Sequence, residues 1–313
     1  MKFAYLIFAH KNPEQFIRLL KALDTEESRF FIHIDKKVQI DGFKKIVQQI
    51  DQSKITWLKR YSIVWAGFNQ IRATLEGLKA VAASNENIDY VSFISSQDYP
   101  IKPVKGFHKY LYESQGKSFI EYFKLPRRNW ANGGLDRIHY YHFLFPSFRI
   151  AFPLISYLKV KLPFTTEPKW SVLKKIIPFI PAAKKFPRKF LKDYTLYEGS
   201  NWFTLHINLV KETLDELEQN KNFYRYFKYT HHADEIFFQT IIINKCLKNS
   251  ANIVNNNLRF VDWTENTGRP MIYRLQHFDM LKNNDCFFAR KFDIEADTAI
   301  LDKLDKEILQ PEN

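Results

Sequence analysis

Apolar runs alternate with amphipathic segments over the first 125 residues, and this alternation limits the chain to one fold class. The helical segments span residues 12–23, 42–50, 68–84 and 104–114, and they separate apolar runs at residues 2–9, 29–35, 55–59, 90–96 and 118–123. Continuous apolar strands separated by amphipathic helices are typical of a parallel sheet that is covered on both faces. The sequence therefore predicts an α/β fold with a mostly parallel sheet flanked by helices.

The alternation stops near residue 126 and resumes near residue 198. Residues 126–198 are rich in Pro, Phe and Lys, and we predict a long insertion with short helices there. Beyond it, we expect helices at residues 208–219, 234–246 and 297–309, and strands at residues 200–207, 259–263 and 269–275. Neither an internal repeat nor a linker is recognisable, so we predict a single domain over residues 1–313.

The charge of the chain favours an anionic partner. Its 47 Lys and Arg against 34 Asp and Glu give a net charge of +13. The stretch from Tyr141 to Lys192 alone holds eleven Lys and Arg and one acid, Glu167. Such a basic and aromatic segment suits the surface of an anionic membrane, and equally an ordinary solvated basic face. Nucleic acid and phosphate-bearing ligands are the other partners that this charge favours.

Cysteine content and hydropathy bear on location. The two cysteines, Cys246 and Cys286, are too few for a disulfide framework or a structural zinc site, and they suit a reducing compartment. The N-terminus lacks the small-residue cleavage site of a signal peptide, and no apolar run approaches the roughly 18 residues of a membrane span. We therefore expect a cytoplasmic protein, with peripheral contact at the inner face of the membrane left open.

Polar residues follow three of the predicted strands. His10 follows the first strand, Asp35 the second and Asp98 the fourth. Ligands of parallel sheets bind beyond the carboxyl ends of the strands, where these side chains would meet. Each residue taken singly is explained equally well as a helix cap or a turn residue. Three on the same edge favour a binding site.

The stretch HHADEIFFQT, residues 231–240, admits three interpretations: a metal site, a helix cap or a catalytic base. Adjacent His231 and His232 do not face the same way on a helix, which disfavours a metal site. Asp234 is a suitable cap for the apolar helix that follows. Glu235 stands at the edge of that helix, where burial raises the pKa of a carboxyl group and suits it to general-base catalysis.

An aromatic platform and separated cations lie nearer the C-terminus. Trp263 follows a predicted strand, and Arg269 and Lys291 lie beyond it. A tryptophan suits a sugar ring, and two cations suit a diphosphate. The chain has no P-loop, no dinucleotide fingerprint and no nucleophile elbow. The segment SSQDYP offers a single Asp98 in place of the D-x-D that often holds a metal ion in nucleotide-sugar enzymes, so no metal is expected.

Eight motifs in order carry a family resemblance. They are YLIFAHKNPEQFIRLLKAL, FFIHIDKK, SIVWAGFNQIRATL, FISSQDYPIK, GSNWFTL, ADEIFFQT, RFVDW and FARKFD, between residues 5 and 293. In this order the chain resembles the core-2/I-branching β-1,6-N-acetylglucosaminyltransferases and the peptide O-xylosyltransferases. The resemblance implies a GT-A fold, an inverting reaction and a UDP-sugar donor bound without a metal ion or other cofactor.

The resemblance also implies roles for single residues. Glu235 matches the catalytic base of the family. Five residues match its donor site, where Asp35 and Trp65 would contact the uridine and Arg269 and Lys291 the diphosphate; the fifth is Asp98. Arg274 is an alternative to Arg269. Glu121 and Trp263 match positions that contact the acceptor sugar.

We thus expect a glycosyltransferase that moves a sugar from a UDP-sugar to a hydroxyl group of a glycan acceptor. The expected sugar is N-acetylglucosamine, and xylose is the alternative on the same scaffold. One alternative of another class is a metal-dependent phosphoesterase that uses His231, His232, Asp234 and Asp98. A basic nucleic-acid-binding module is the other, although carboxylates at the strand ends would repel nucleic acid, which we therefore do not expect as a partner.

Overall fold

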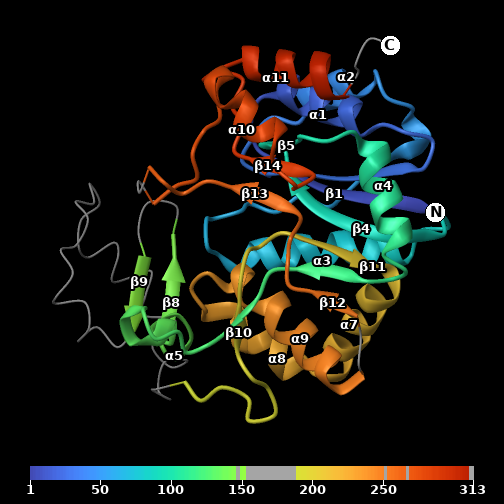
Figure 1. Cartoon of the computed structure of the whole chain (residues 1–313). Helices are drawn as coiled ribbons and strands as arrows, with labels where there is room; N and C mark the ends of the chain where they lie inside the picture. The colour runs from blue at the N-terminus through green and yellow to red at the C-terminus, as the bar shows by residue number, and fades with distance from the viewer. Residues whose placement is uncertain (146–148, 153–187, 250–251, 266–267, 310–313) are drawn as a thin grey trace.

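A seven-stranded sheet forms the centre of the molecule (Figure 1). The computed structural model describes residues 1–145, 149–152, 188–249, 252–265 and 268–309 of the chain. In spatial order the strands are β12 (Ile253–Val254), β6 (Ser118–Ile120), β11 (Phe203–His206), β4 (Ile88–Ser95), β1 (Lys2–Ala9), β2 (Ser28–Ile34) and β3 (Ile55–Trp57).

The sheet is mostly parallel, as predicted. Strand β1 pairs in parallel with both β2 and β4, and β2 pairs in parallel with β3. Strand β11 is the exception, because it runs antiparallel to β4 and to β6. The carboxyl ends of β1, β2 and β4 consequently meet at one edge of the sheet, where parallel sheets bind ligands.

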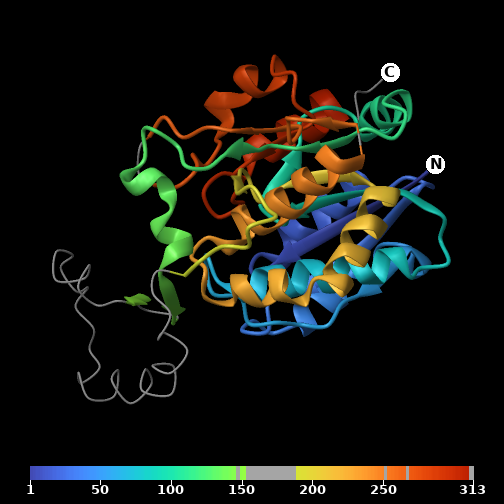
Figure 2. The same ribbon diagram turned by 90° about the horizontal axis from the view of Figure 1, so that it is seen from below.

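Helices cover both faces of the sheet (Figures 1 and 2). One face packs against α1 (Pro13–Leu23), α2 (Asp41–Val47), α4 (Val104–Glu113), α10 (Phe278–Lys282) and α11 (Ala299–Leu304). The other face packs against α3 (Phe68–Ala82), α7 (Ile207–Gln219), α8 (Lys221–Tyr226) and α9 (Phe237–Asn249). Two apolar cores result, one on each side of the sheet.

After Lys2, strand β1 is apolar and buried because its two faces pack into the two cores. Tyr5 and Ile7 belong to the core beneath α1, whereas Leu6 and Phe8 belong to the core beneath α3. Successive side chains of a strand point to opposite faces, so a strand buried on both faces needs an unbroken apolar run. Helix α3 approaches β1 at Gly77, where any Cβ atom would collide with the side chain of Leu6.

A second, three-stranded sheet lies beside the first. It has the order β13 (Arg259–Val261), β14 (Phe288–Arg290) and β5 (Asp98–Pro100). Strand β14 runs parallel to β13 and antiparallel to β5, and the register places Arg290 opposite Asp98. This sheet joins the C-terminal segment of the chain to the end of β4.

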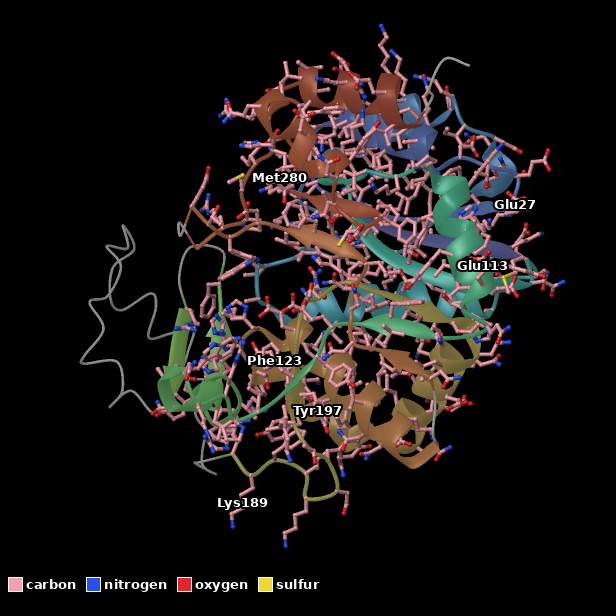
Figure 3. All side chains as sticks on the ribbon, viewed as in Figure 1. Glu27, Glu113, Phe123, Lys189, Tyr197 and Met280 are labelled. Carbon is pink, nitrogen blue, oxygen red and sulfur yellow. The ribbon has the colours of Figure 1, made fainter. Side chains whose placement is uncertain are left out.

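The described parts of the predicted insertion contain strands as well as a short helix. Residues 126–145, 149–152 and 188–198 are described, and they include α5 (Asp136–His139), the antiparallel pair β8 (Tyr141–Leu144) and β9 (Arg149–Phe152), and β10 (Tyr197–Glu198). Strand β10 pairs with β7 (Phe123–Lys124); Figure 3 labels Phe123 and Tyr197 on these two strands. Residues 153–187 lie outside the described residues, so the prediction of short helices is untested there.

The predicted strand at residues 269–275 is wrong. Its backbone pairs at two positions. Met271 donates to the carbonyl of Asp262 (2.8 Å), and around Lys291 the segment both donates, from Tyr273 to the carbonyl of Lys291 (2.9 Å), and accepts, from Lys291 at the carbonyl of Met271 (3.2 Å). Pro270 lacks the N–H group that a continuous ladder would need there. The predicted helix at residues 297–309 is present, as α11 followed by a π-helical turn over Asp305–Leu309.

Within the described part of the chain, no helix is both long enough and apolar enough to cross a membrane.

Candidate active site

The carboxyl ends of β1, β2 and β4 are tied together by backbone hydrogen bonds. Asp35 donates its N–H to the carbonyl of Ala9 (2.9 Å), and Ser96 donates to that of Phe8 (2.9 Å). Phe292, just after β14, donates to the carbonyl of Gln97 (2.9 Å). The three strand ends that the sequence singled out therefore lie at one edge, together with the segment that carries Lys291.

The carboxylate of Asp35 organises the loop that leads to Trp65. It accepts hydrogen bonds from the backbone N–H groups of Lys37 (2.9 Å) and Ile63 (3.3 Å). Asp35 is buried, whereas Trp65 beyond it is 76% exposed. An exposed indole on a loop that is bound by a buried carboxylate is suited to stacking against a flat ligand.

Asp98 is completely buried, and its contacts are with protein. Its carboxylate forms ion pairs with Arg259 (2.7 Å) and Arg290 (3.4 Å), and accepts a hydrogen bond from the N–H of Ser95 (2.7 Å). Both guanidinium groups also lie over the ring of Trp202, at 4.9 and 4.8 Å from its centroid. Asp98 thus holds Arg259 and Arg290 in place, and its expected contact with a donor stays a prediction.

Cations gather around Lys291. Burial lowers the pKa of its ammonium group, and the charges of Arg290, Lys11 and Arg269 lower it further. Burial likewise lowers the pKa of His10, and the charge of Lys291 is the largest electrostatic contribution there. Cations that disfavour one another's charged forms are stabilised by a shared anion. This group, here called the basic cluster, comprises Lys11, Arg290, Lys291 and Arg269.

The two candidate arginines near Lys291 differ in their surroundings. Arg269 is exposed and lowers the pKa of Lys291 through its charge. Arg274 instead lies at the N-cap of the turn Leu275–His277. The pKa of Asp297 is lowered: burial, the largest single effect, raises it, but hydrogen bonds and the charge of Arg274 together lower it by more. The electrostatic environment thus favours Arg269 as the partner of Lys291.

Glu235 lies in a 3₁₀ turn, Ala233–Glu235, directly before α9. Its carboxylate Oε2 is 3.3 Å from His232 Nδ1 and 3.6 Å from Arg137 Nη1, and its side chain is 36% exposed. The ring of Trp65 meets that of His232 edge-on, with 4.7 Å between centroids. The loop that carries Trp65, which Asp35 binds through Ile63, therefore reaches the turn that holds Glu235. This contact links the expected donor and catalytic residues.

Asp234 does not cap helix α9, contrary to the sequence-based prediction. The helix begins at Phe237, and Asp234 lies within the preceding turn, whose N-cap is His232 in the left-handed region at φ 51°. Asp234 is half-buried, with its Oδ1 atom fully covered, and desolvation, followed by the charge of Glu235, raises its pKa to about 7. The apolar side chains of Ile236 and Phe237 draw the turn into the core, which moves the helix start past the aspartate.

Glu121 lies close enough to Glu235 to sense its charge. Burial raises the pKa of Glu121, and the negative charge of Glu235 adds to that rise. Its carboxylate accepts a hydrogen bond from Asn257 Nδ2 (3.2 Å). The backbone of Gly199 packs against its carbonyl group so closely that any Cβ atom at Gly199 would collide with it. Glu121 and Glu235 thus line one region.

Trp263 follows β13 and is 56% exposed. Nothing in the described structure tests its expected contact with an acceptor, which stays a prediction.

No cluster of three or more His, Cys, Asp or Glu side chains suitable for a metal ion occurs among the described residues. Two cavities, of about 260 and 580 Å³, lie elsewhere, between α3 and α7–α8 and beside α1–α2. Neither is lined by a predicted site residue, so the assignment of the site depends on the side chains and not on the shape of a cavity.

Most of the chain matches one enzyme family. The family model described as Core-2/I-Branching enzyme matches residues 3–285. The chain belongs to the Core-2/I-Branching enzyme family. The match includes Asp35, Trp65, Glu235 and Arg269, and it ends a few residues before Lys291.

Proteins similar to this Core-2/I-Branching family member include animal xylosyltransferases. Xylosyltransferase sqv-6 from Caenorhabditis briggsae is 22% identical over 326 residues, which cover 95% of this chain and 35% of that protein. Xylosyltransferase 2 from Rattus norvegicus is 25% identical over 332 residues, covering 97% and 33%. Xylosyltransferase oxt from Drosophila melanogaster is 23% identical over 319 residues, covering 94% and 32%. The chain thus spans about a third of the length of these relatives.

Among solved structures, a 4-diphosphocytidyl-2C-methyl-D-erythritol synthase from Anaerococcus prevotii matches with a TM-score of 0.34 and 12% identity, over 70% of this chain and 75% of that one. We base no conclusion on a likeness this low.

Three residues of this family member went unassigned in the sequence-based site. Arg290 joins the basic cluster because β14 and β5 place it opposite Asp98. Arg137 and Glu198 come from the two described ends of the insertion and meet each other beside Glu235. Arg137 and Glu198 are about 60 residues apart in the sequence, and Arg290 and Asp98 about 190, so neither contact produces a local sequence pattern. The FARKFD motif does contain Arg290.

Glu198 provides a pH-dependent test of this geometry. Its side chain is 1% exposed, and burial raises its pKa to about 8 although the charge of Arg137 opposes the shift. A carboxyl group whose pKa is raised on folding stabilises the fold below its unfolded pKa, and that stability is lost as the pH rises toward 8. We therefore expect Glu198→Gln to gain stability over wild type, on the order of a few kcal/mol, between pH 5 and pH 9.

Urea unfolding of both proteins at the two pH values measures this difference. Asp234 titrates in the same window but is present in both proteins, so its contribution cancels. A difference in unfolding free energy that stays constant with pH would contradict the assignment.

Proposed function

We propose that this Core-2/I-Branching family member is an inverting, metal-independent glycosyltransferase with a UDP-sugar donor and Glu235 as its general base. The observation that carries the proposal is that the loop bound by Asp35 contacts the turn that holds Glu235. A partly exposed carboxylate lies at the start of α9, and the basic cluster lies after β14. Trp65 lies in contact with the catalytic turn.

In this mechanism Glu235 takes the proton of the acceptor hydroxyl group as its oxygen attacks C1 of the donor sugar. The bond from C1 to the diphosphate breaks on the opposite face, which inverts the configuration. Negative charge then builds on the departing UDP, where Lys291 and its neighbouring cations stabilise it. Trp65 and the loop held by Asp35 would receive the uridine.

Two donor sugars are candidates. N-acetylglucosamine is our first candidate, from the motifs shared with branching enzymes. The relatives reported above are named xylosyltransferases, which favours testing xylose beside it. Glu121 and Trp263 are the residues we propose for the acceptor.

The two alternatives of other classes receive less support. A phosphoesterase would need His231, His232, Asp234 and Asp98 around a metal ion, but Asp98 is committed to two arginines. Nucleic-acid binding has no support from the family comparison.

Thermal stabilisation by ligands tests the proposal. UDP should raise the melting temperature in the presence of EDTA, because a ligand that binds only the folded state stabilises it. A single-stranded oligonucleotide at the same phosphate concentration should not do so. Stabilisation by the oligonucleotide alone, or by UDP only with added metal, would overturn the proposal.

A separate proposal concerns the basic insertion, most of which lies outside the described residues. Its charge is interleaved with apolar residues, and each Lys or Arg near an anionic bilayer contributes about 1 kcal/mol. We expect the protein to co-sediment with anionic liposomes and to be released by salt. Replacing Lys174, Lys175, Lys184 and Lys185 by Glu should abolish sedimentation and leave UDP binding intact. Equal sedimentation with neutral liposomes, or none with either, would contradict this.

A further inference from the structure

Arg137 of helix α5 is in contact with two carboxyl groups at once. Its Nη1 atom donates to Glu198 Oε1 and lies 3.6 Å from Glu235 Oε2. The two partners come from distant parts of the chain, since Glu198 lies in β10 and Glu235 precedes α9. One guanidinium group therefore joins the insertion to the proposed catalytic turn.

Further contacts fix Arg137 in position. Its backbone carbonyl accepts a hydrogen bond from the N–H of His231 (3.1 Å), which ties α5 to the 231–235 segment. Its guanidinium lies over the ring of Trp130, 4.6 Å from the centroid. The backbone N–H of Gly199 donates to the carbonyl of Glu235 (2.9 Å), so the residue after Glu198 is bound to the same turn. A side chain held from this many directions is suited to setting the orientation of another.

The protonation state of Glu198 decides which carboxylate balances the charge of Arg137. Glu198 Oε2 is buried and has no hydrogen-bond partner in the described part of the chain, so a proton on that oxygen is favoured over a bare charge. The raised pKa of Glu198 agrees with this. With Glu198 protonated, Oε1 still accepts the hydrogen bond from Arg137, and the positive charge of Arg137 is left to balance Glu235.

We infer that Arg137, held by Glu198, is a positioning residue that fixes the carboxylate of Glu235 for uptake of the acceptor proton. The inference rests on the proposed function and deepens it. It also gives the insertion a role at the site, because α5 and β10 are its two described ends.

Several charged groups face Glu235, and each bears on its ionisation. Arg137 comes from α5 and Glu198 from β10, whereas His232 and Asp234 belong to the same turn as Glu235. Glu121, after β6, adds a further negative charge. Among these, Arg137 favours the ionised form of Glu235, and the neighbouring carboxylates oppose it when they are charged.

The test compares Arg137→Gln, Arg137→Lys, Glu198→Leu and Glu198→Gln with Glu235→Gln. The assay is UDP release from UDP-N-acetylglucosamine and UDP-xylose between pH 5 and pH 9. Arg137→Gln should lower kcat about 10- to 100-fold with unchanged UDP affinity, and should shift the acid limb of the pH–rate profile upward by about one pH unit. Arg137→Lys, which keeps the charge, should recover part of the rate and most of the profile. Glu198→Leu should resemble Arg137→Gln, and Glu198→Gln should lose less than Glu198→Leu.

Arg18→Gln is the matched control. Arg18 of α1 also bridges two carboxylates, Asp302 and Asp305, each at 2.7 Å, but on another part of the molecule. Its loss should leave the pH profile in place. If Glu235→Gln is inactive while Arg137→Gln keeps the wild-type kcat and profile, the inference is wrong and the proposed function stands. If Glu235→Gln keeps its activity, the proposed function itself fails, and the inference with it.

Discussion

Replacing Glu235 by Gln is expected to lower the rate of sugar transfer about 10²–10⁴-fold, the usual contribution of a general base. The amide has nearly the shape of the carboxylate, but it cannot take up the proton of the acceptor. The side chain of Glu235 is about one-third exposed to solvent, so the fold should tolerate the change. UDP affinity should stay at the wild-type value, because the basic cluster lies on other segments.

Steady-state rates of UDP release, together with the melting temperature, check this expectation. Glu113→Gln is the matched control: Glu113 lies on α4, well apart from Phe123 of β7 in Figure 3, and its ion pair with Lys109 is an exposed one. It should behave as wild type. A Glu235→Gln protein that keeps more than about half its turnover would show that another group is the base.

The second large effect is expected at the donor diphosphate. Lys291→Ala should weaken UDP binding by about 1.5–3 kcal/mol, the range for hydrogen bonds to charged groups. Burial and the charges of Arg290 and Lys11 lower the pKa of Lys291 by more than the nearby Asp293 raises it, so a bound anion would stabilise its charged form. Arg269→Ala should weaken binding over the same range, because its charge acts on the same group.

Calorimetric titration of UDP into EDTA-treated protein measures both effects. Lys245→Ala serves as the control, since Lys245 is also partly buried but pairs with Glu216 (3.3 Å) on the α7–α9 side of the molecule. Unchanged UDP affinity in both the Lys291 and Arg269 variants would exclude the basic cluster as the diphosphate site.

The sequence predicted the sheet well because its strands are local signals. An unbroken apolar run such as residues 2–9 can only be a strand buried on both faces, and its partners follow from the order of the helices. The grouping of His10, Asp35 and Asp98 at one edge was also predictable, because parallel strands end together. The strand expected at residues 269–275 failed because strand propensity there is not matched by a neighbour that can pair continuously.

The part of the site that escaped prediction depends on tertiary contacts. Asp98 looked like a ligand-facing carboxylate, but the register of β14 against β5 buries it between two arginines. Arg137 and Glu198 lie in the predicted insertion, residues 126–198, on either side of the basic stretch from Tyr141 to Lys192. The sequence had suggested a membrane surface or a solvated basic face for that stretch, and no role for these two residues. Their contacts with each other and with Glu235 depend on how the two ends of the insertion pack near the start of α9. Hydrophobic periodicity in the sequence does not predict such packing.

Catalysis by the metal-free protein is the central expectation of the proposed function. The direct measurement is UDP release by EDTA-treated wild type from UDP-N-acetylglucosamine and UDP-xylose, with Glu235→Gln assayed in parallel. We expect release from at least one of the two donors, at a rate that EDTA does not change, and loss of that release in the variant. A strict requirement for Mn²⁺ or Mg²⁺, or release from neither donor by a protein that also fails to bind UDP, would contradict the account.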